Sequence, residues 1–252
     1  MLSLNSINVR FDSNYILRDL SCQVKQGDFI VIVGTNGAGK STFFDTIAGK
    51  IKPISGSILL DGIDVTYWNE LKLSSMVTRI FQNTQLNSVG SMTVEQNLAM
   101  TQYSRRSARL IDGMADMPTN RAQELVHTLG MPESILKKSM NTLSGGQRQL
   151  IAFVMATQQI PKILLLDEPT AALDPQASTK LLQYATQFIR KNKITTLLIT
   201  HDPHIALSIG NKIWVLEHGT ITKQFELEEK ENLKPDHLIG HIDYDALKLY
   251  NR

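Results

Sequence analysis

The chain has 252 residues, of which 42% are hydrophobic and 20% are charged, as is ordinary for a folded globular protein long enough for one large α/β domain. Its 26 basic and 24 acidic side chains leave a net charge of +2, which excludes the strong field that draws a protein to nucleic acid. The single cysteine, Cys22, excludes an intramolecular disulfide.

No segment predicts export or membrane insertion. Residues 1–12 lack the basic start and the apolar stretch of about 7–15 residues that mark a signal peptide. Nowhere do about 18 apolar residues follow one another, so no transmembrane helix is predicted. We therefore expect a soluble protein that reaches a membrane only through a partner.

The N-terminal part of the chain has the pattern of β-strands. Alternating apolar residues, with turns at 12–14 and 26–28, predict antiparallel strands in this region. The β-branched run at 29–33 predicts a buried strand. A further strand at 58–60 leads into a tight turn at 61–62.

The segment after the strand at 29–33 matches the pattern G-x-x-x-x-G-K-[ST]. Glycines allow a tight turn whose N–H groups point at phosphate oxygens, and the following helix, predicted from Gly39 to Gly49, adds its positive end. Lys40 supplies a full charge, and the Ser41 hydroxyl can bind Mg²⁺. The predicted cradle consists of Gly34, Thr35, Asn36, Gly37, Ala38, Gly39, Lys40, Ser41 and Thr42.

Between about residues 86 and 141 the pattern becomes helical, which predicts an insertion into the α/β core. Thr93 can cap a helix with Gln96 at the capping-box position. A second helix is expected over 120–129, and 105–118 is expected to be a loosely structured connection.

A second glycine-rich helix start follows this insertion, with Ser144 as the N-cap and Gln147 at the capping-box position. An ordinary well-capped helix would have the same pattern. Its place between the first cradle and an acid pair favours a second phosphate-binding surface. The residues of this surface are Ser144, Gly145, Gly146 and Gln147.

The acid pair Asp167-Glu168 ends the apolar run 163–166. A buried strand there would place Asp167 beside the first cradle as a Mg²⁺ ligand, with Glu168 directed at the attacking water. The alternative is a surface turn before Pro169.

Four single residues are further candidates. Gln82 follows an apolar strand end and can touch Mg²⁺, although a surface glutamine would have the same pattern. His201 also follows a strand and can hydrogen-bond a phosphate, unless it is a plain loop histidine. Phe11 can stack on a purine or be a core residue, and Tyr15 is the second candidate for stacking.

The remaining chain returns to alternating strands and helices. Helices are predicted around 178–191 and 203–210, with strands at 195–200 and 212–216. The charge-rich tail from 225 onward carries no recognisable chemistry.

Together these motifs resemble the ATP-binding subunit of an ABC transporter, over about residues 2–222. The resemblance implies a P-loop NTPase of ABC ATPase type, an α/β fold with a RecA-like core, an N-terminal antiparallel β region and an inserted helical subdomain at about 86–141. Residues 1–224 would form the ATPase domain, and 225–252 a C-terminal extension.

The resemblance also implies a role for each motif. Glu168, His201 and Lys40 would be catalytic, and Ser41, Gln82 and Asp167 would hold Mg²⁺. The family positions are filled by Phe11 for adenine stacking, 34–42 for Walker A, Gln82 for the Q-loop, 143–147 for the signature, 163–168 for Walker B, 171–174 with Asp174 for the D-loop, and His201 for the switch histidine.

In such a system ATP closes a head-to-tail homodimer and hydrolysis reopens it. The implied partners are transmembrane permease subunits and an extracytoplasmic solute-binding protein, with the ATPase peripheral on the cytoplasmic face of the membrane and no nucleic-acid partner. Residues 79–83, 93–100 and 144–149 are similar to ATPases of tryptophan/tyrosine-type uptake systems, so import of a small solute such as an amino acid is expected.

Two alternatives remain open. A soluble ABC ATPase acting on nucleic acid or ribosomes would carry the same motifs, although that class usually joins two such domains in one chain. Leu86, Val89 and Met92, just after Gln82, form either ordinary core or a groove that receives a helix of a membrane subunit.

Overall fold

The computed structural model describes residues 1–103, 119–171 and 173–242. The connection predicted at 105–118 and Ala172 of the D-loop therefore lie outside the described residues. The chain forms two compact units, which are described separately. The first unit comprises Met1–Arg79, Pro161–Glu168 and Ile189–Arg252, and the second comprises Ile80–Ile160 and Pro169–Phe188.

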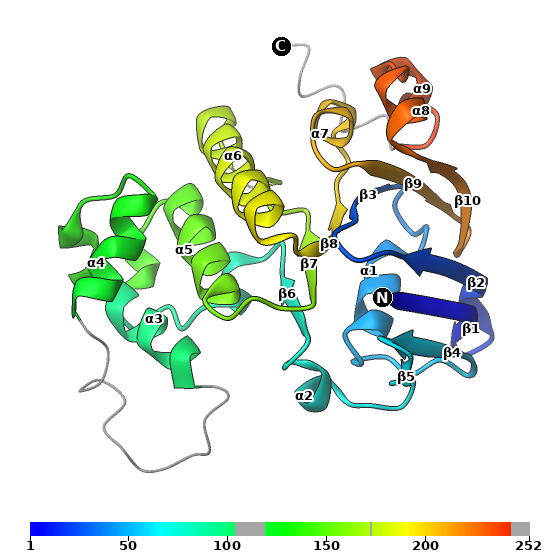
Figure 1. The fold of residues 1–252 in the computed structure, drawn as a ribbon, viewed down its shortest axis with the longest axis horizontal. Helices are drawn as coiled ribbons and strands as arrows, with labels where there is room; N and C mark the ends of the chain where they lie inside the picture. The colour runs from blue at the N-terminus through cyan, green and yellow to red at the C-terminus, as the bar shows by residue number, and fades with distance from the viewer. Residues whose placement is uncertain (104–118, 172, 243–252) are drawn as a thin grey trace. The chain divides into compact units, whose positions relative to one another are not determined.

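A four-stranded antiparallel sheet begins the first unit (Figure 1). Leu2 pairs with Val24 across the first hairpin and with Leu60 on the other side, so these apolar side chains reach the same core. The sheet order is β2 (Asn14–Val24), β1 (Leu2–Phe11), β4 (Ser55–Leu60) and β5 (Ile63–Asp64).

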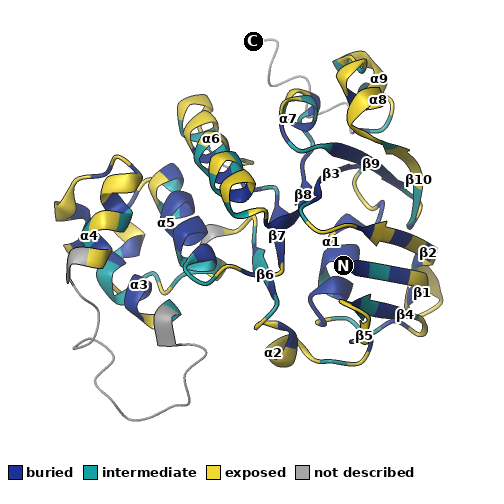
Figure 2. Cartoon of the chain, viewed as in Figure 1, coloured by how far each residue is buried: buried dark blue, intermediate teal, exposed yellow. Residues whose placement is uncertain are grey.

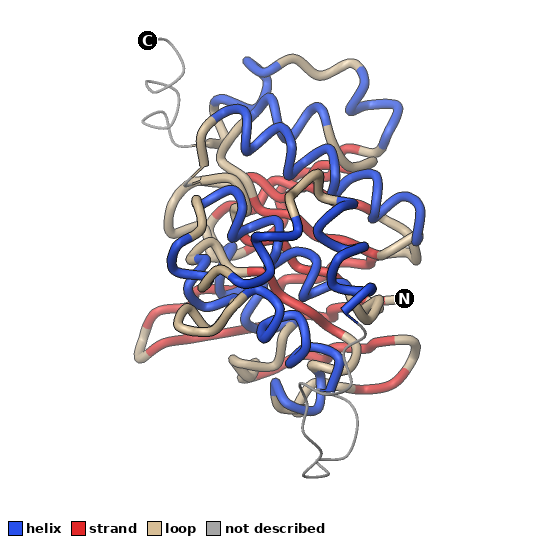
Figure 3. The backbone as a smooth tube through the Cα atoms, turned by 90° about the vertical axis from the view of Figure 1, so that its left-hand side faces the viewer, coloured by secondary structure: helices blue, strands red, loops and turns tan. Residues whose placement is uncertain are grey.

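The second sheet of this unit has six strands, which Figure 3 shows in red with those of the first sheet. Strand β3 pairs in parallel with β8 and β9, β7 pairs in parallel with β8, and β10 is antiparallel to β9. The sheet order is β10 (Thr220–Phe225), β9 (Lys212–Glu217), β3 (Phe29–Val33), β8 (Thr195–Ile199), β7 (Ile163–Asp167) and β6 (Val77–Ile80). The expected α/β class with an antiparallel N-terminal region is confirmed.

Helix α1 (Lys40–Ile47) connects the two sheets through one core. Its Phe43 and Phe44 are fully buried with apolar residues from strands of both sheets, which appear dark blue in Figure 2. Cys22 of β2 belongs to this core, and burial raises the pKa of its thiol to about 12. The short helix α2 (Glu70–Leu73) lies in the same unit.

The second unit is helical. Phe153, Tyr184 and Phe188 join α5 to α6 through edge-to-face and stacked ring contacts. The capping box of Thr93 and Gln96 is confirmed at the start of α3. The elements are η1 (Thr84–Asn87), α3 (Val94–Tyr103), α4 (Thr119–Thr128), η2 (Glu133–Lys137), η3 (Met140–Thr142), α5 (Gly145–Thr157) and α6 (Pro175–Asn192), whose last residues, from Ile189, belong to the first unit.

The C-terminal segment folds back onto the first unit through buried lysines. Lys230 donates hydrogen bonds to the carbonyls of Ile209 and Gly210, and burial, with Arg190 nearby, lowers its pKa to about 8. Lys212 bridges Asp28 and Glu226 at 3.2 and 3.1 Å. The segment contains α8 (Leu227–Glu231) and α9 (Pro235–Ile239), and it follows α7 (Pro203–Ser208) and the strand β10. Of these two preceding elements, α7 was predicted from the sequence and β10 was not.

Candidate functional site

The glycine-rich loop joins β3 to α1 and leaves the start of that helix uncapped. Gly39 is the N-cap, with a φ of 102° and no side-chain capping bond, and the first turn contains no acidic residue. The first N–H groups of an α-helix have no partner within the helix, so an uncapped start favours an anion. Gly34 is required for a different reason: a Cβ there would lie 2.3 Å from the carbonyl oxygen of Leu216 in β9.

Lys40 projects back into its own loop. Its Nζ donates hydrogen bonds of 2.7 and 2.8 Å to the carbonyls of Gly34 and Thr35, and the residue is 7% exposed. The next residue, Ser41, is exposed. The loop thus holds a buried cation beside the open helix start, which is the arrangement that a polyphosphate requires.

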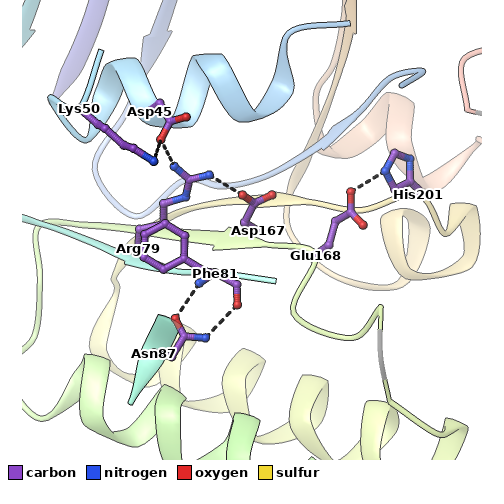
Figure 4. A network of polar contacts seen from close by, with 8 residues as sticks. All are labelled: Asp45, Lys50, Arg79, Phe81, Asn87, Asp167, Glu168 and His201. Carbon is purple, nitrogen blue, oxygen red and sulfur yellow. Dashed lines mark hydrogen bonds and ion pairs between the residues drawn. The ribbon is translucent and has the colours of Figure 1, made fainter. Parts of the chain in front are cut away.

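The acid pair ends β7, and its two carboxylates have different surroundings (Figure 4). Asp167 is buried, and its Oδ2 lies 2.5 Å from Nη2 of Arg79. Nη1 of the same guanidinium lies 2.6 Å from Oδ1 of Asp45 in α1. Neither Arg79 nor Asp45 had a role predicted from the sequence. The available signal was a charged residue in a short strand, between the buried Val77 and Ile80.

Glu168 lies against His201, with Oε1 and Nε2 2.5 Å apart (Figure 4). Its φ of 46° is in the left-handed region, and its N–H donates to the carbonyl of Ile199 at the end of β8. Since an ionised carboxylate only accepts, the hydrogen of this contact belongs to Nε2. Nδ1 of His201 is buried and has no hydrogen-bond partner among the described residues. The sequence predicted both residues but not their contact, in which the imidazole holds the carboxylate in one direction.

Two of the expected Mg²⁺ ligands, Ser41 and Asp167, lie in the first unit. The Ser41 hydroxyl and the Asp167 carboxylate are hard oxygen ligands, and Mg²⁺ in nucleotide sites takes one or two such ligands together with phosphate oxygens. Oδ1 of Asp167 receives no hydrogen bond from the described residues. Within the same part of the chain no group of three His, Cys, Asp or Glu side chains could hold a metal by itself.

Phe11 and Tyr15 are both exposed at the end of the β1–β2 hairpin, by 50% and 43%. Phe11 is therefore not a core residue. The guanidinium carbon of Arg10 lies 5.9 Å from the centre of the Tyr15 ring. Of the two aromatic rings, that of Phe11 is the more open for stacking.

The other candidate residues belong to the second unit. Ser144 caps α5 with a complete capping box: its hydroxyl accepts from the N–H of Gln147, whose side chain accepts from the N–H of Ser144, both at 3.2 Å. A Cβ on Gly146 would lie 2.5 Å from that of Ala177, so this glycine permits close packing of α5 on α6. Asp174 caps α6 through the N–H of Ala177 at 2.9 Å, and Gln82 is exposed.

A buried strand, an uncapped glycine-rich helix start and an acid pair on a parallel strand of the same sheet define a P-loop nucleotide hydrolase. The chain belongs to the ABC transporter family, whose model matches residues 17–171. A second model, described as an AAA domain of a putative AbiEii toxin of a type IV toxin–antitoxin system, matches only residues 136–208.

Related proteins agree with this family. A tyrosine transport ATP-binding protein of Clostridioides difficile is 34% identical over 97% of this chain and 99% of its own. The high-affinity branched-chain amino acid transport ATP-binding protein LivG of Salmonella typhimurium is 30% identical over 96% and 97%. A dimeric ATP-binding cassette in a post-hydrolysis state, bound to ADP and phosphate, is 26% identical, with a TM-score of 0.75 over 90% of this chain and 99% of that chain.

The chain is therefore an ATPase of the ABC transporter family. In the described part of the chain, no helix has both the length and the apolar character needed to cross a membrane.

Proposed function

We propose that this protein is the ATP-hydrolysing subunit of a transporter that imports an amino acid or a similar small solute through a separate membrane subunit. The observation that carries the proposal is the contact of Glu168 with His201 in the unit that also holds the uncapped P-loop helix. The relatives named for transport of tyrosine and branched-chain amino acids support the solute class.

Hydrolysis would begin with the phosphates bound by Lys40 and by the N–H groups of 34–42, with Phe11 stacked on the adenine. Mg²⁺, held by Ser41 and Asp167 of the first unit, would offset charge on the phosphates. Glu168 would orient the attacking water and accept a proton from it, and His201 would donate its Nε2–H to that carboxylate and so hold it in place.

The start of α5 would act in a second copy of the chain, in a head-to-tail homodimer closed by ATP. Gln147 donates to the Ser144 oxygen, so the hydroxyl hydrogen of Ser144 remains available to a phosphate. The dimeric cassette bound to ADP and phosphate supports an assembly of this kind.

A surface for the membrane subunit is offered after Gln82. Leu86, Val89 and Met92 are 65%, 38% and 37% exposed, which excludes the core alternative for these side chains. The buried amide of Asn97 binds both the N–H and the carbonyl of Val89, at 2.8 and 3.0 Å. We infer that this loop is held in shape to receive an apolar helix of a permease.

The loop is held at its beginning as well. The side chain of Asn87 accepts from the N–H of Phe81 and donates to its carbonyl, at 2.9 and 2.8 Å (Figure 4). Both asparagines satisfy backbone groups in a segment without regular pairing. The apolar side chains are thus displayed by a loop that already has its internal hydrogen bonds.

The test is co-purification with membranes of cells that express the complete transport system. We expect Leu86→Glu and Val89→Glu to be released from the membrane complex while they still bind ATP with the parent affinity. Leu71→Glu is the matched control, because Leu71 is an 83% exposed leucine in the first unit. Unchanged membrane association of both variants would contradict this docking surface. Absence of ATP-dependent solute uptake, or an ATPase rate stimulated by RNA, would contradict the transport function.

A further inference from the structure

The guanidinium of Arg79 joins three elements of the first unit. It bridges Asp45 of α1 and Asp167 of β7, with N–O distances of 2.6 and 2.5 Å, while Arg79 itself is on β6. Its Cζ lies 5.8 Å from the centre of the Phe44 ring. The Arg79 side chain is 9% exposed, so its charge is paired inside the protein and is not presented to the solvent (Figure 4).

The two carboxylates come from the two elements that carry the expected Mg²⁺ ligands. Asp45 is one helical turn after Ser41, on the same face of α1. Asp167 is itself the expected ligand at the end of β7. Arg79 therefore connects the helix of one ligand to the side chain of the other.

The charges require such a connection. The side chains of Asp45 and Asp167 are only 16% and 10% exposed. Asp45 has a second cation, because Nζ of Lys50 lies 3.5 Å from its Oδ1 (Figure 4). Among the described residues Asp167 has no other ion pair, so without Arg79 it would be a partly desolvated carboxylate without its cation. Planar guanidinium groups fix carboxylates in direction as well as in charge. Here Nη2 of Arg79 donates a hydrogen bond to Oδ2 of Asp167, and Oδ1 of Asp167 receives no hydrogen bond from the described residues.

We propose that Arg79 is a positioning residue that fixes the Asp167 carboxylate, with one oxygen held and the other presented, for the magnesium of MgATP. This inference rests on the proposed function, in which Asp167 binds that ion. The opposite role, a resident cation that competes with Mg²⁺ for Asp167, uses the same contacts and predicts an effect of opposite sign.

The test compares Arg79→Met, Arg79→Lys and Asp45→Asn with the parent chain, using a fluorescent ATP analogue. Affinity is measured in EDTA and then during a Mg²⁺ titration. We expect Arg79→Met to raise the half-saturating Mg²⁺ concentration by about 10–100-fold, the range for partners that orient metal ligands. Affinity in EDTA should stay within about twofold, since the P-loop contacts do not involve Arg79.

Lysine keeps the charge of Arg79 but cannot hold two carboxylates in one plane, so Arg79→Lys should give a smaller shift in the same direction. Asp45→Asn leaves the Arg79–Asp167 contact and should also give an intermediate shift. Arg18→Met, at an exposed arginine of β2, is the matched control and should give none.

Three results would overturn the inference. A lower half-saturating Mg²⁺ concentration in Arg79→Met would make Arg79 a competitor. An unchanged value would make it purely structural, and so would equal losses of affinity with and without Mg²⁺. If Arg79→Met does not fold, Arg79→Lys and Asp45→Asn decide by the same criteria. If the nucleotide affinity of the parent protein does not depend on Mg²⁺, that result refutes the proposed metal role of Asp167, independently of the variants.

Discussion

The two glycine-rich helix starts of this chain look alike in sequence and differ in structure. Helix α1 has Gly39 as its N-cap, a residue without a side chain that could cap it, and the first helical residue, Lys40, adds a cation. Helix α5 begins at Ser144, and a complete capping box with Gln147 already satisfies one of its first N–H groups. The first is an open anion site, and the second is a finished helix end with a hydroxyl hydrogen left to donate.

The difference indicates a division of labour. An open helix start with its own cation binds phosphate within a single chain, whereas a capped start adds only a weak contact and needs a phosphate already held elsewhere. Substitutions in the first unit should therefore act on ATP affinity or on hydrolysis itself. Substitutions at Ser144 should change hydrolysis only through the contact of two chains, and within one chain they should change only the stability of the helix start.

The largest effect is expected from Glu168→Gln. The amide keeps the volume but cannot accept a proton from water, so turnover should fall by about 10²–10⁴-fold while ATP binding is preserved. Steady-state phosphate release and a binding titration measure the two quantities. ATP should also hold a stable dimer, detectable by light scattering. Near-normal turnover would remove Glu168 from the mechanism.

Ser144→Arg tests the second helix start. A bulky cation removes the cap and obstructs closure, so hydrolysis should fall by about 10²-fold, in the range seen when one transition-state donor is lost. ATP affinity of the dilute monomer should not change. Analytical ultracentrifugation with ATP should show no dimer. Weak ATP binding by the monomer would mean that Ser144 acts within its own chain.

Lys40→Ala acts on the open start. Loss of a charge-assisted contact costs about 1.5–3 kcal/mol, or about 10- to 150-fold in ATP affinity. Isothermal calorimetry on the monomer measures it directly. An affinity within twofold of the parent value would contradict the P-loop assignment.

Ser144→Ala should have the smallest effect. It deletes the hydroxyl that accepts from Gln147 and should lower the free energy of unfolding by about 0.5–2 kcal/mol, with no change in monomer ATP affinity. Thr93→Ala, at the other capping box of the same unit, is the control and should lose a similar amount in urea titrations. If Ser144→Ala lost ATP binding and Thr93→Ala did not, the start of α5 would bind ATP within its own chain, and the two helix starts would not differ in function.

Local patterns made much of the fold predictable. The apolar runs at 29–33, 163–166 and 195–200 are the buried strands β3, β7 and β8, because only central parallel strands need such uniform side chains. The capping box at Ser144 is also confirmed, since its two partners are three residues apart. The strand β10 was missed because Thr220–Phe225 has no apolar run and is partly exposed.

The contacts of the site were harder to predict, because their partners are distant in sequence. Arg79 meets Asp45 and Asp167 only after three elements have packed, and nothing near Arg79 in the chain indicates either carboxylate. The Glu168–His201 contact likewise depends on β7 and β8 being neighbours and on the left-handed backbone at Glu168. The sequence predicts the chemical groups, and the sheet order decides which of them touch.

Cys22 gives the chain a practical property for spectroscopy. It is the single cysteine of the sequence, it is 6% exposed, and burial raises the pKa of its thiol to about 12. The thiol therefore stays protonated at neutral pH, and the thiolate is the form that reacts. A cysteine placed at an exposed position such as Val89 would then be the one thiol that maleimide dyes modify. Two subunits labelled in this way could report the distance between their dyes during turnover, and Cys22 would not have to be replaced first.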